Sequence, residues 1–235
     1  MSCCTRWPTT RPCGRSCSAP TASSPERGAE ASLVDLSTVL PETSRGVSAA
    51  ALSKGVAAID APVSGSTPQA EQGALIIFVG GEQQAYESAA AVLSVLGRHV
   101  HMGSSGAGTT TKLVTNTLLG LGVEALAEAV ALGRKAGLET RRLLDALQLT
   151  SVVSPAQKAK FDNISGGRYP PAFALRMMSK DYGLILRLAE SLSVAMPATA
   201  AARQIDLIEN ARHRDGDEDF SAVIRTVQEL SGLHS

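Results

Sequence analysis

The chain has 235 residues, of which 44% are hydrophobic and 19% charged, and its 22 basic and 22 acidic side chains cancel. This balance is typical of a globular protein. A net charge of zero argues against binding nucleic acid or a membrane surface through a basic face. The apolar runs, such as 74–79, are far shorter than the ~20 residues of a membrane span. We therefore expect a soluble, cytoplasmic protein with an aliphatic core.

Residues 1–31 differ from the rest of the chain. All four cysteines lie within Cys3–Cys17, and no acidic residue precedes Glu26. No periodicity predicts a helix or strand, so we expect an irregular leader. The cysteine spacing matches zinc ligands poorly, whereas the basic, acid-free composition fits an organellar transit peptide. We favour a third interpretation, a frameshift product, because residues 4–29 read one base over in G+C-rich codons encode a helical pattern.

From residue 32 onward, short apolar strands alternate with helices, which predicts an α/β layered structure. The expected strands are 32–36, 56–59, 74–79 and 98–102, and the expected helices are 41–54 and 82–96. Pro41 opens the first helix, where its missing N–H costs nothing.

After residue 104 the sequence predicts only helices. A long helix at 107–136 ends at Gly137, and its middle is apolar nearly all round, as in a helix buried among other helices. Further helices are expected at 140–149, 179–192, 197–210 and 220–230. The expected domains are therefore a leader (1–31), an α/β part (32–104) and an all-α part (105–235).

A glycine-rich turn, 103–108, lies between the last strand and the long helix. Its spacing reverses the G-x-G-x-x-G order of a dinucleotide-binding loop, and no strand follows the helix. We interpret it as a turn that lets the long helix begin close to the α/β layer.

Lys112 and Asn116 lie four residues apart near the start of the long helix, so they share one face of it. A lysine among apolar residues loses solvation, which lowers its pKa toward the range useful for acid/base chemistry. A carboxamide one turn away can orient a substrate hydroxyl. The alternative is an ordinary surface lysine and a surface asparagine.

Two loops follow predicted strands, where α/β sheets bind ligands. In the loop after the second strand, Ser64, Gly65 and Ser66 expose backbone N–H groups that can hold a carboxylate, although a plain turn explains them equally well. Thr38 has the same placement after the first strand. Lys180 and Asp181 begin a later helix, and a surface charge pair is the alternative for them. The four histidines show no metal-ligand spacing.

Taken together, these motifs resemble the β-hydroxyacid dehydrogenase family, in its 3-hydroxyisobutyrate dehydrogenase-like group. The matching stretches are 34–38, 60–65, 103–112 with Asn116, and 180–181, in the same order along residues 32–232. The resemblance implies a partial Rossmann-like α/β domain followed by an all-α domain built on one long helix. It also implies NAD or NADP as cofactor and an active site in the cleft between the two domains.

The resemblance implies a role for each motif. Lys112 is the general acid/base for the substrate hydroxyl, and Asn116 hydrogen-bonds the substrate. Ser64, Gly65 and Ser66 form the loop that holds the substrate carboxylate. The residues that bind the cofactor are Thr38, Lys180 and Asp181. The expected partners are a small carboxylic-acid substrate and a second or further copy of the chain, in a homodimer or homotetramer, with no nucleic acid and no membrane.

This chain departs from the family pattern in two ways. Ser66 stands where a second glycine is usual, which adds a side chain beside the carboxylate loop. The glycine loop that holds the pyrophosphate should precede residue 32, and the leader does not contain it. We therefore expect a dehydrogenase that acts on a short 3-hydroxy acid, with an activity that is impaired by an N-terminal truncation. The alternatives are a glyoxylate or tartronate semialdehyde reductase of the same family and a non-catalytic helical oligomerisation module.

Overall fold

The structure is a computed structural model that describes residues 32–212 and 217–233. Residues 31–235 pack as one compact unit. Strands alternate with helices up to Gly103, and only helices follow, which confirms the predicted fold class. The hypotheses about the leader concern residues that lie outside the described part of the chain.

The sheet of the α/β part is mixed. Its strands are β1 (Ser32–Asp35), β2 (Ala57–Asp60), β3 (Val63–Ser64), β4 (Leu75–Gly80) and β5 (Gly97–Gly103). β1 pairs with β2 and β5 pairs with β4 in parallel, whereas β4 runs antiparallel to both β2 and β3. Across the described residues, β1 pairs only with β2 and so lies at one edge of the sheet.

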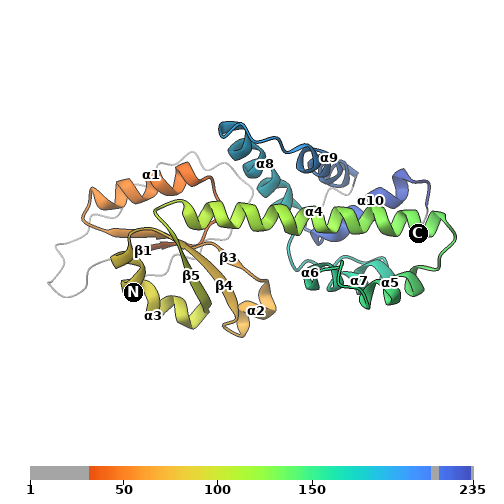
Figure 1. Ribbon diagram of the computed structural model, residues 1–235, viewed down its shortest axis with the longest axis horizontal. Coiled ribbons are helices and arrows are strands. Elements are labelled where there is room, and N and C mark those ends of the chain that lie inside the picture. The colour runs from red at the N-terminus through yellow and green to blue at the C-terminus, as the bar shows by residue number, and fades with distance from the viewer. Residues whose placement is uncertain (1–31, 213–216, 234–235) are drawn as a thin grey trace. The chain divides into compact units, whose positions relative to one another are not determined.

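Helices cover both faces of this sheet. They are α1 (Pro41–Leu52), the short α2 (Thr67–Glu71) and α3 (Gln83–Leu96). Figure 1 shows α1 and the start of the next helix, α4, on one face and α3 on the other. Aliphatic side chains of β2 and β4 pack against the inner face of α3, and this layer forms its own hydrophobic core.

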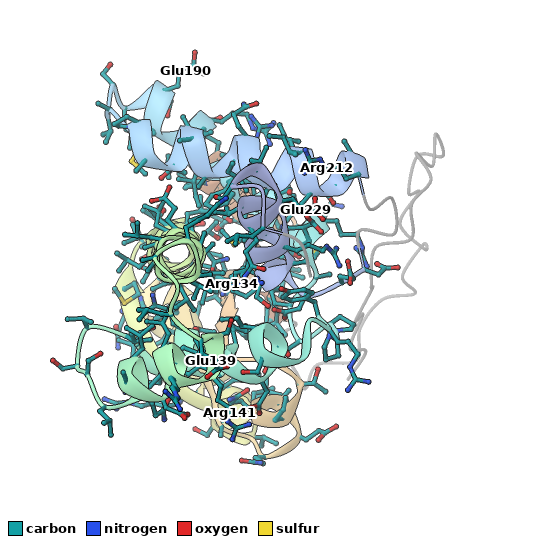
Figure 2. All side chains as sticks on the ribbon, turned by 90° about the vertical axis from the view of Figure 1, so that its right-hand side faces the viewer. Arg134, Glu139, Arg141, Glu190, Arg212 and Glu229 are labelled. Carbon is teal, nitrogen blue, oxygen red and sulfur yellow. The ribbon has the colours of Figure 1, made fainter. Side chains whose placement is uncertain are left out.

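The all-α part is built around α4 (Ala107–Lys135). The elements that follow are α5 (Thr140–Gln148), α6 (Pro155–Lys158), α7 (Phe161–Gly166), α8 (Leu175–Ser191), α9 (Pro197–Arg212), the 3₁₀ turn η1 (Phe220–Ala222) and α10 (Val223–Leu230). The second hydrophobic core lies among α4, α8, α9 and α10. Arg212 of α9 and Glu229 of α10 form an ion pair at 2.9 Å, and both are labelled in Figure 2.

The structure adds elements that the sequence did not predict. β3, α2, α6 and α7 have at most six residues each, too few to show a periodicity. The expectation that α8 begins at Ser179 is wrong, because the helix begins at Leu175. Its N-cap, Ala174, carries no capping side chain, so the sequence lacks the usual start signal.

By length and composition alone, α4 is long and apolar enough to cross a membrane. It is also packed against six other helices, and two of its polar side chains, Asn116 and Glu124, are buried. A core helix passes the same test, so this property gives only weak support to a membrane span.

Candidate active site

The start of α4 is held by a carboxylate from the sheet. Asp60, the last residue of β2, accepts hydrogen bonds from the backbone N–H groups of Gly106 (2.7 Å) and Thr109 (2.8 Å). The Thr109 hydroxyl donates to the same carboxylate and is itself 2.9 Å from the Ser44 hydroxyl of α1. A buried carboxylate at a helix N-terminus satisfies free N–H groups and complements the helix dipole. Asp60 therefore fixes where α4 leaves the sheet.

The glycine-rich turn allows this close approach. Gly106 has a φ of +90°, which favours glycine, and a Cβ on Gly108 would lie 2.3 Å from the carbonyl oxygen of Phe78. The interpretation of 103–108 as a turn that brings α4 against the sheet is confirmed. Asp60 occupies the N–H groups of Gly106 and Thr109, where a phosphate loop would instead hold a phosphate.

Lys112 and Asn116 lie one turn apart on α4, as predicted. Lys112 is half-buried, and burial lowers its pKa; the nearby charge of Asp181 opposes this shift and that of Lys180 adds to it. Asn116 is almost completely buried. The interpretation of both as ordinary surface residues is therefore wrong.

Asp181 of α8 connects these residues to the α/β part. One of its oxygens accepts a hydrogen bond from the Asn116 side-chain amide (2.6 Å), and the other is 2.9 Å from the Lys180 ammonium. Lys180 also donates to the backbone carbonyl of Thr38 (2.8 Å), in the loop after β1. Asp181 is only 1% exposed, so Lys180 and Asp181 are not a surface charge pair. These contacts thus join four of the predicted residues into one cluster, and the charges of Asp181 and Lys180 act on Lys112.

The predicted carboxylate loop lies apart from these contacts. Ser64 ends β3 rather than following β2 directly, because Val63 and Ser64 pair with β4. Gly65 has a φ of +132°, which a side chain would strain. The backbone N–H and the hydroxyl of Ser66 both donate to the Gln69 side-chain oxygen, at 3.0 and 2.9 Å. Within the described residues, no hydrogen bond joins this loop to Lys112, so its role stays a prediction.

Sequence reasoning gave no role to Asp60. An acidic residue directly after an apolar strand was the available signal. Its partners, however, are backbone groups 46 and 49 residues further on, and only the folded chain brings them together.

Comparisons with known proteins agree with an α/β part followed by an all-α part. The family model described as NAD-binding of NADP-dependent 3-hydroxyisobutyrate dehydrogenase matches residues 106–227. The model for the NAD binding domain of 6-phosphogluconate dehydrogenase matches residues 20–104. The first covers the all-α part and the second covers the α/β part.

Three relatives illustrate the similarity. The chain is 39% identical to 2-(hydroxymethyl)glutarate dehydrogenase of Eubacterium barkeri over 86% of its own length and 67% of the relative's. It is also 39% identical to glyoxylate/succinic semialdehyde reductase 1 of Arabidopsis thaliana, over 83% and 68% of the two lengths. A solved structure of 3-hydroxyisobutyrate dehydrogenase from Mycobacterium tuberculosis with L-serine superposes with a TM-score of 0.75 at 30% identity, covering 84% of this chain and 70% of that one.

The fold and these comparisons define a nicotinamide-dependent oxidoreductase, with an α/β layer followed by a helical part. The chain belongs to the β-hydroxyacid dehydrogenase family, in its 3-hydroxyisobutyrate dehydrogenase-like group, and its cofactor is NAD or NADP. It spans about two thirds of the length of the relatives described above.

The described residues fit one half of such a cofactor. The Thr38 loop lies at the carboxyl end of β1 and is held by Lys180, beside the lysine that would face the reacting ring. Ligands of open α/β sheets bind beyond the carboxyl ends of the strands, which is where this loop lies. The G-x-G-x-x-G spacing that would hold the pyrophosphate does not occur in the sequence.

Proposed function

We propose that this chain catalyses hydride transfer between NAD(P) and a short 3-hydroxy acid or its semialdehyde, with Lys112 as general acid/base. The observation that carries the proposal is the environment of Lys112: burial lowers its pKa, and a buried carboxylate lies nearby. A lowered pKa brings an amine closer to the range in which a general acid/base works.

The two directions of the reaction use the two states of Lys112. In oxidation, the neutral amine accepts the hydroxyl proton while the carbon-bound hydrogen leaves as hydride. In reduction, the ammonium donates a proton to the oxygen of the former carbonyl. The nicotinamide, when bound, supplies or accepts the hydride. Asp181 favours the ammonium form and holds the Asn116 amide in place.

The substrate carboxylate distinguishes this proposal from a general alcohol dehydrogenase. Ser64 and Gly65 would hold it through backbone N–H groups, a chemistry suited to anions. Ser66 would contribute its N–H only if Gln69 moved away, since Gln69 accepts from it. A short acid fits because the carboxylate and the reacting carbon must lie close together.

Replacing Lys112 tests this function. With NAD(P) at millimolar concentration and a panel of short 3-hydroxy acids, Lys112→Met is expected to lower turnover about 10³-fold, as for loss of a general acid/base. Lys54→Met, at an exposed lysine after α1, is the control and should leave turnover unchanged. Equal turnover by the two variants, or turnover with none of the acids, would refute the proposal.

A second candidate is a reductase of glyoxylate or tartronate semialdehyde. The similarity to a relative named glyoxylate/succinic semialdehyde reductase supports it. Competition between glyoxylate and a 3-oxo acid for the same chain, measured as a kcat/KM ratio, separates the two candidates.

We also propose a cytoplasmic homodimer or homotetramer. An exposed apolar stripe on α4 supports association: Val114, Leu118 and Leu132 are 57%, 72% and 73% exposed. With exposed Ala125 they recur at intervals of four and seven residues, which places them on one side of the helix.

A further inference from the structure

A group of buried acidic and hydroxyl side chains lies between helices of the all-α part, away from Lys112. Glu124 comes from α4, Tyr182 from α8 and Asp206 from α9, and their exposed fractions are 9%, 1% and 1%. Glu124 lies two turns beyond Asn116 on the same helix, so it is farther along the helix from Lys112 than Asn116 is. None of these three residues has a part in the proposed reaction.

Within the described residues, neither Glu124 nor Asp206 forms an ion pair. The nearby Arg225 of α10 pairs instead with Glu209 and Glu218. Asp206 accepts one hydrogen bond, from the Ser179 hydroxyl at 3.0 Å. An uncompensated buried carboxylate is costly, and the usual outcome is that it keeps its proton.

The Tyr182 hydroxyl is a second buried polar group in this region that lacks a partner. It is buried, and it has no hydrogen-bond partner. It lies against Gly120 of α4, where an added Cβ would be 2.2 Å from its oxygen. Both Asp206 and Glu124 act on it electrostatically. A buried hydroxyl without a partner is rare.

The titration properties of the group agree with its geometry. Burial, reinforced by the charges of Asp206 and Glu128, raises the pKa of Glu124 to about 8. Burial also raises the pKa of Asp206 to about 7, the hydrogen bond from Ser179 opposing this shift and the charge of Glu209 adding to it. Burial raises the pKa of Tyr182 as well, so this residue stays neutral.

We propose that Glu124 and Asp206 are a proton-holding pair, and that loss of their protons above neutral pH loosens the packing of α4 against α8 and α9. The charged and titratable groups around the pair are Glu128 of α4, Tyr182 of α8 and Glu209 of α9, which is paired with Arg225 of α10. Arg203 lies one turn before Asp206 on α9, with its guanidinium against Gly183 of α8. Ionising the pair would therefore place two negative charges in a buried layer where neither acid has an ion-pair partner among the described residues.

A bound metal ion is a poorer explanation. In the part of the chain that the structure describes, no group of three or more His, Cys, Asp or Glu side chains is arranged to hold one. A proton on either acid would also let that acid donate a hydrogen bond, for which the Tyr182 oxygen is a free acceptor.

The loosening would reach the candidate active site. Tyr182 follows Asp181 directly on α8, and Asp181 holds Asn116 and Lys180. The proton-holding pair therefore connects alkaline pH to the position of the residues around Lys112. It does not depend on the proposed reaction, and its test needs no activity.

The test is thermal unfolding as a function of pH. An acid whose folded pKa is raised contributes stability that is complete below the unfolded pKa and is lost as pH rises through the folded pKa. The wild-type midpoint should thus fall on the order of 5 °C between pH 6 and 9. Glu124→Gln and Asp206→Asn should each flatten this slope by about half.

Glu190→Gln is the matched control. Glu190 is exposed, and in Figure 2 its side chain points away from the helices around it. This variant should keep the wild-type slope. A wild-type slope in both Glu124→Gln and Asp206→Asn would overturn the proposal.

A second measurement keeps the proposal testable if the variants do not fold. In wild-type protein carrying ¹³C-labelled glutamate and aspartate carboxyls, we expect one glutamate and one aspartate signal to titrate above pH 6. Titration of every carboxyl below pH 5.5 would overturn the proposal.

Discussion

At the scale of single residues, two opposing effects set the state of Lys112. Burial among the apolar groups of α4 disfavours the ammonium, whereas the Asp181 carboxylate favours it. Asp181 also receives the Asn116 amide and the Lys180 ammonium, so one buried acid sets both the charge and the geometry of the cluster.

Asp181→Asn should therefore lower the pKa of Lys112 further. Since oxidation requires the neutral amine, the pH at which the oxidation rate reaches half its plateau should move to lower pH. A pH profile of kcat for oxidation checks this. Asp145→Asn, at an exposed acid of α5, should leave the profile in place, and a profile that moves to higher pH in Asp181→Asn would contradict the argument.

A second residue-scale prediction concerns Asp60. Asp60→Asn weakens the hydrogen bonds that the Asp60 carboxylate accepts from two backbone N–H groups and a hydroxyl at the start of α4. We expect a loss of about 2 kcal/mol in the free energy of unfolding, as for a buried helix cap. Urea unfolding measures it, with the exposed Asp145→Asn as reference. A difference below about 0.5 kcal/mol between the two variants would mean that Asp60 does not anchor the helix.

At the scale of elements, the important contact is that between α4 and the sheet. The first turn of α4 passes so close to β2 and β4 that no side chain fits at Gly108. This contact places Lys112 one turn further along the helix, near the ends of the strands.

Gly108→Ala should therefore destabilise the fold. Its Cβ would meet backbone atoms of Phe78, Asp60 and Gly80, none of which can turn away as a side chain can. We expect a loss of about 3 kcal/mol in the free energy of unfolding. Gly46→Ala, in α1 where nothing lies within 4 Å, should be neutral or stabilise by up to ~1 kcal/mol. Equal stability of the two variants in urea would show that α4 can move off the sheet at little cost.

At the scale of the whole molecule, the apolar stripe on α4 remains exposed. Leu118 and Leu132 are large side chains in contact with solvent, and such a stripe is expected to be covered in an oligomer.

Leu118→Glu should disrupt association, because it places a charge in the centre of the stripe. Sedimentation velocity at micromolar concentration should show the wild-type chain as a dimer or tetramer and Leu118→Glu at a lower mass. Leu52→Glu, at an equally exposed leucine of α1, is the control and should keep the wild-type mass. An unchanged mass in Leu118→Glu would exclude the stripe as the interface.

The sequence was sufficient for the longer elements and for the motifs within them. Its long helices and apolar strands have clear periodicities, so their type and order were predictable, and the spacing of Lys112 and Asn116 placed both on one face of a helix. Short elements such as α2 and α6 were not predicted, because so few residues carry no periodic signal.

Only the tertiary structure decided which distant residues meet. Asp181 lies 65 residues from Asn116, and Lys180 lies 142 residues from Thr38, yet each pair shares a hydrogen bond. The burial of Glu124 beside Asp206 has the same origin. The energy of a charge depends on what surrounds it, and in this chain those surroundings come from helices that are remote in sequence.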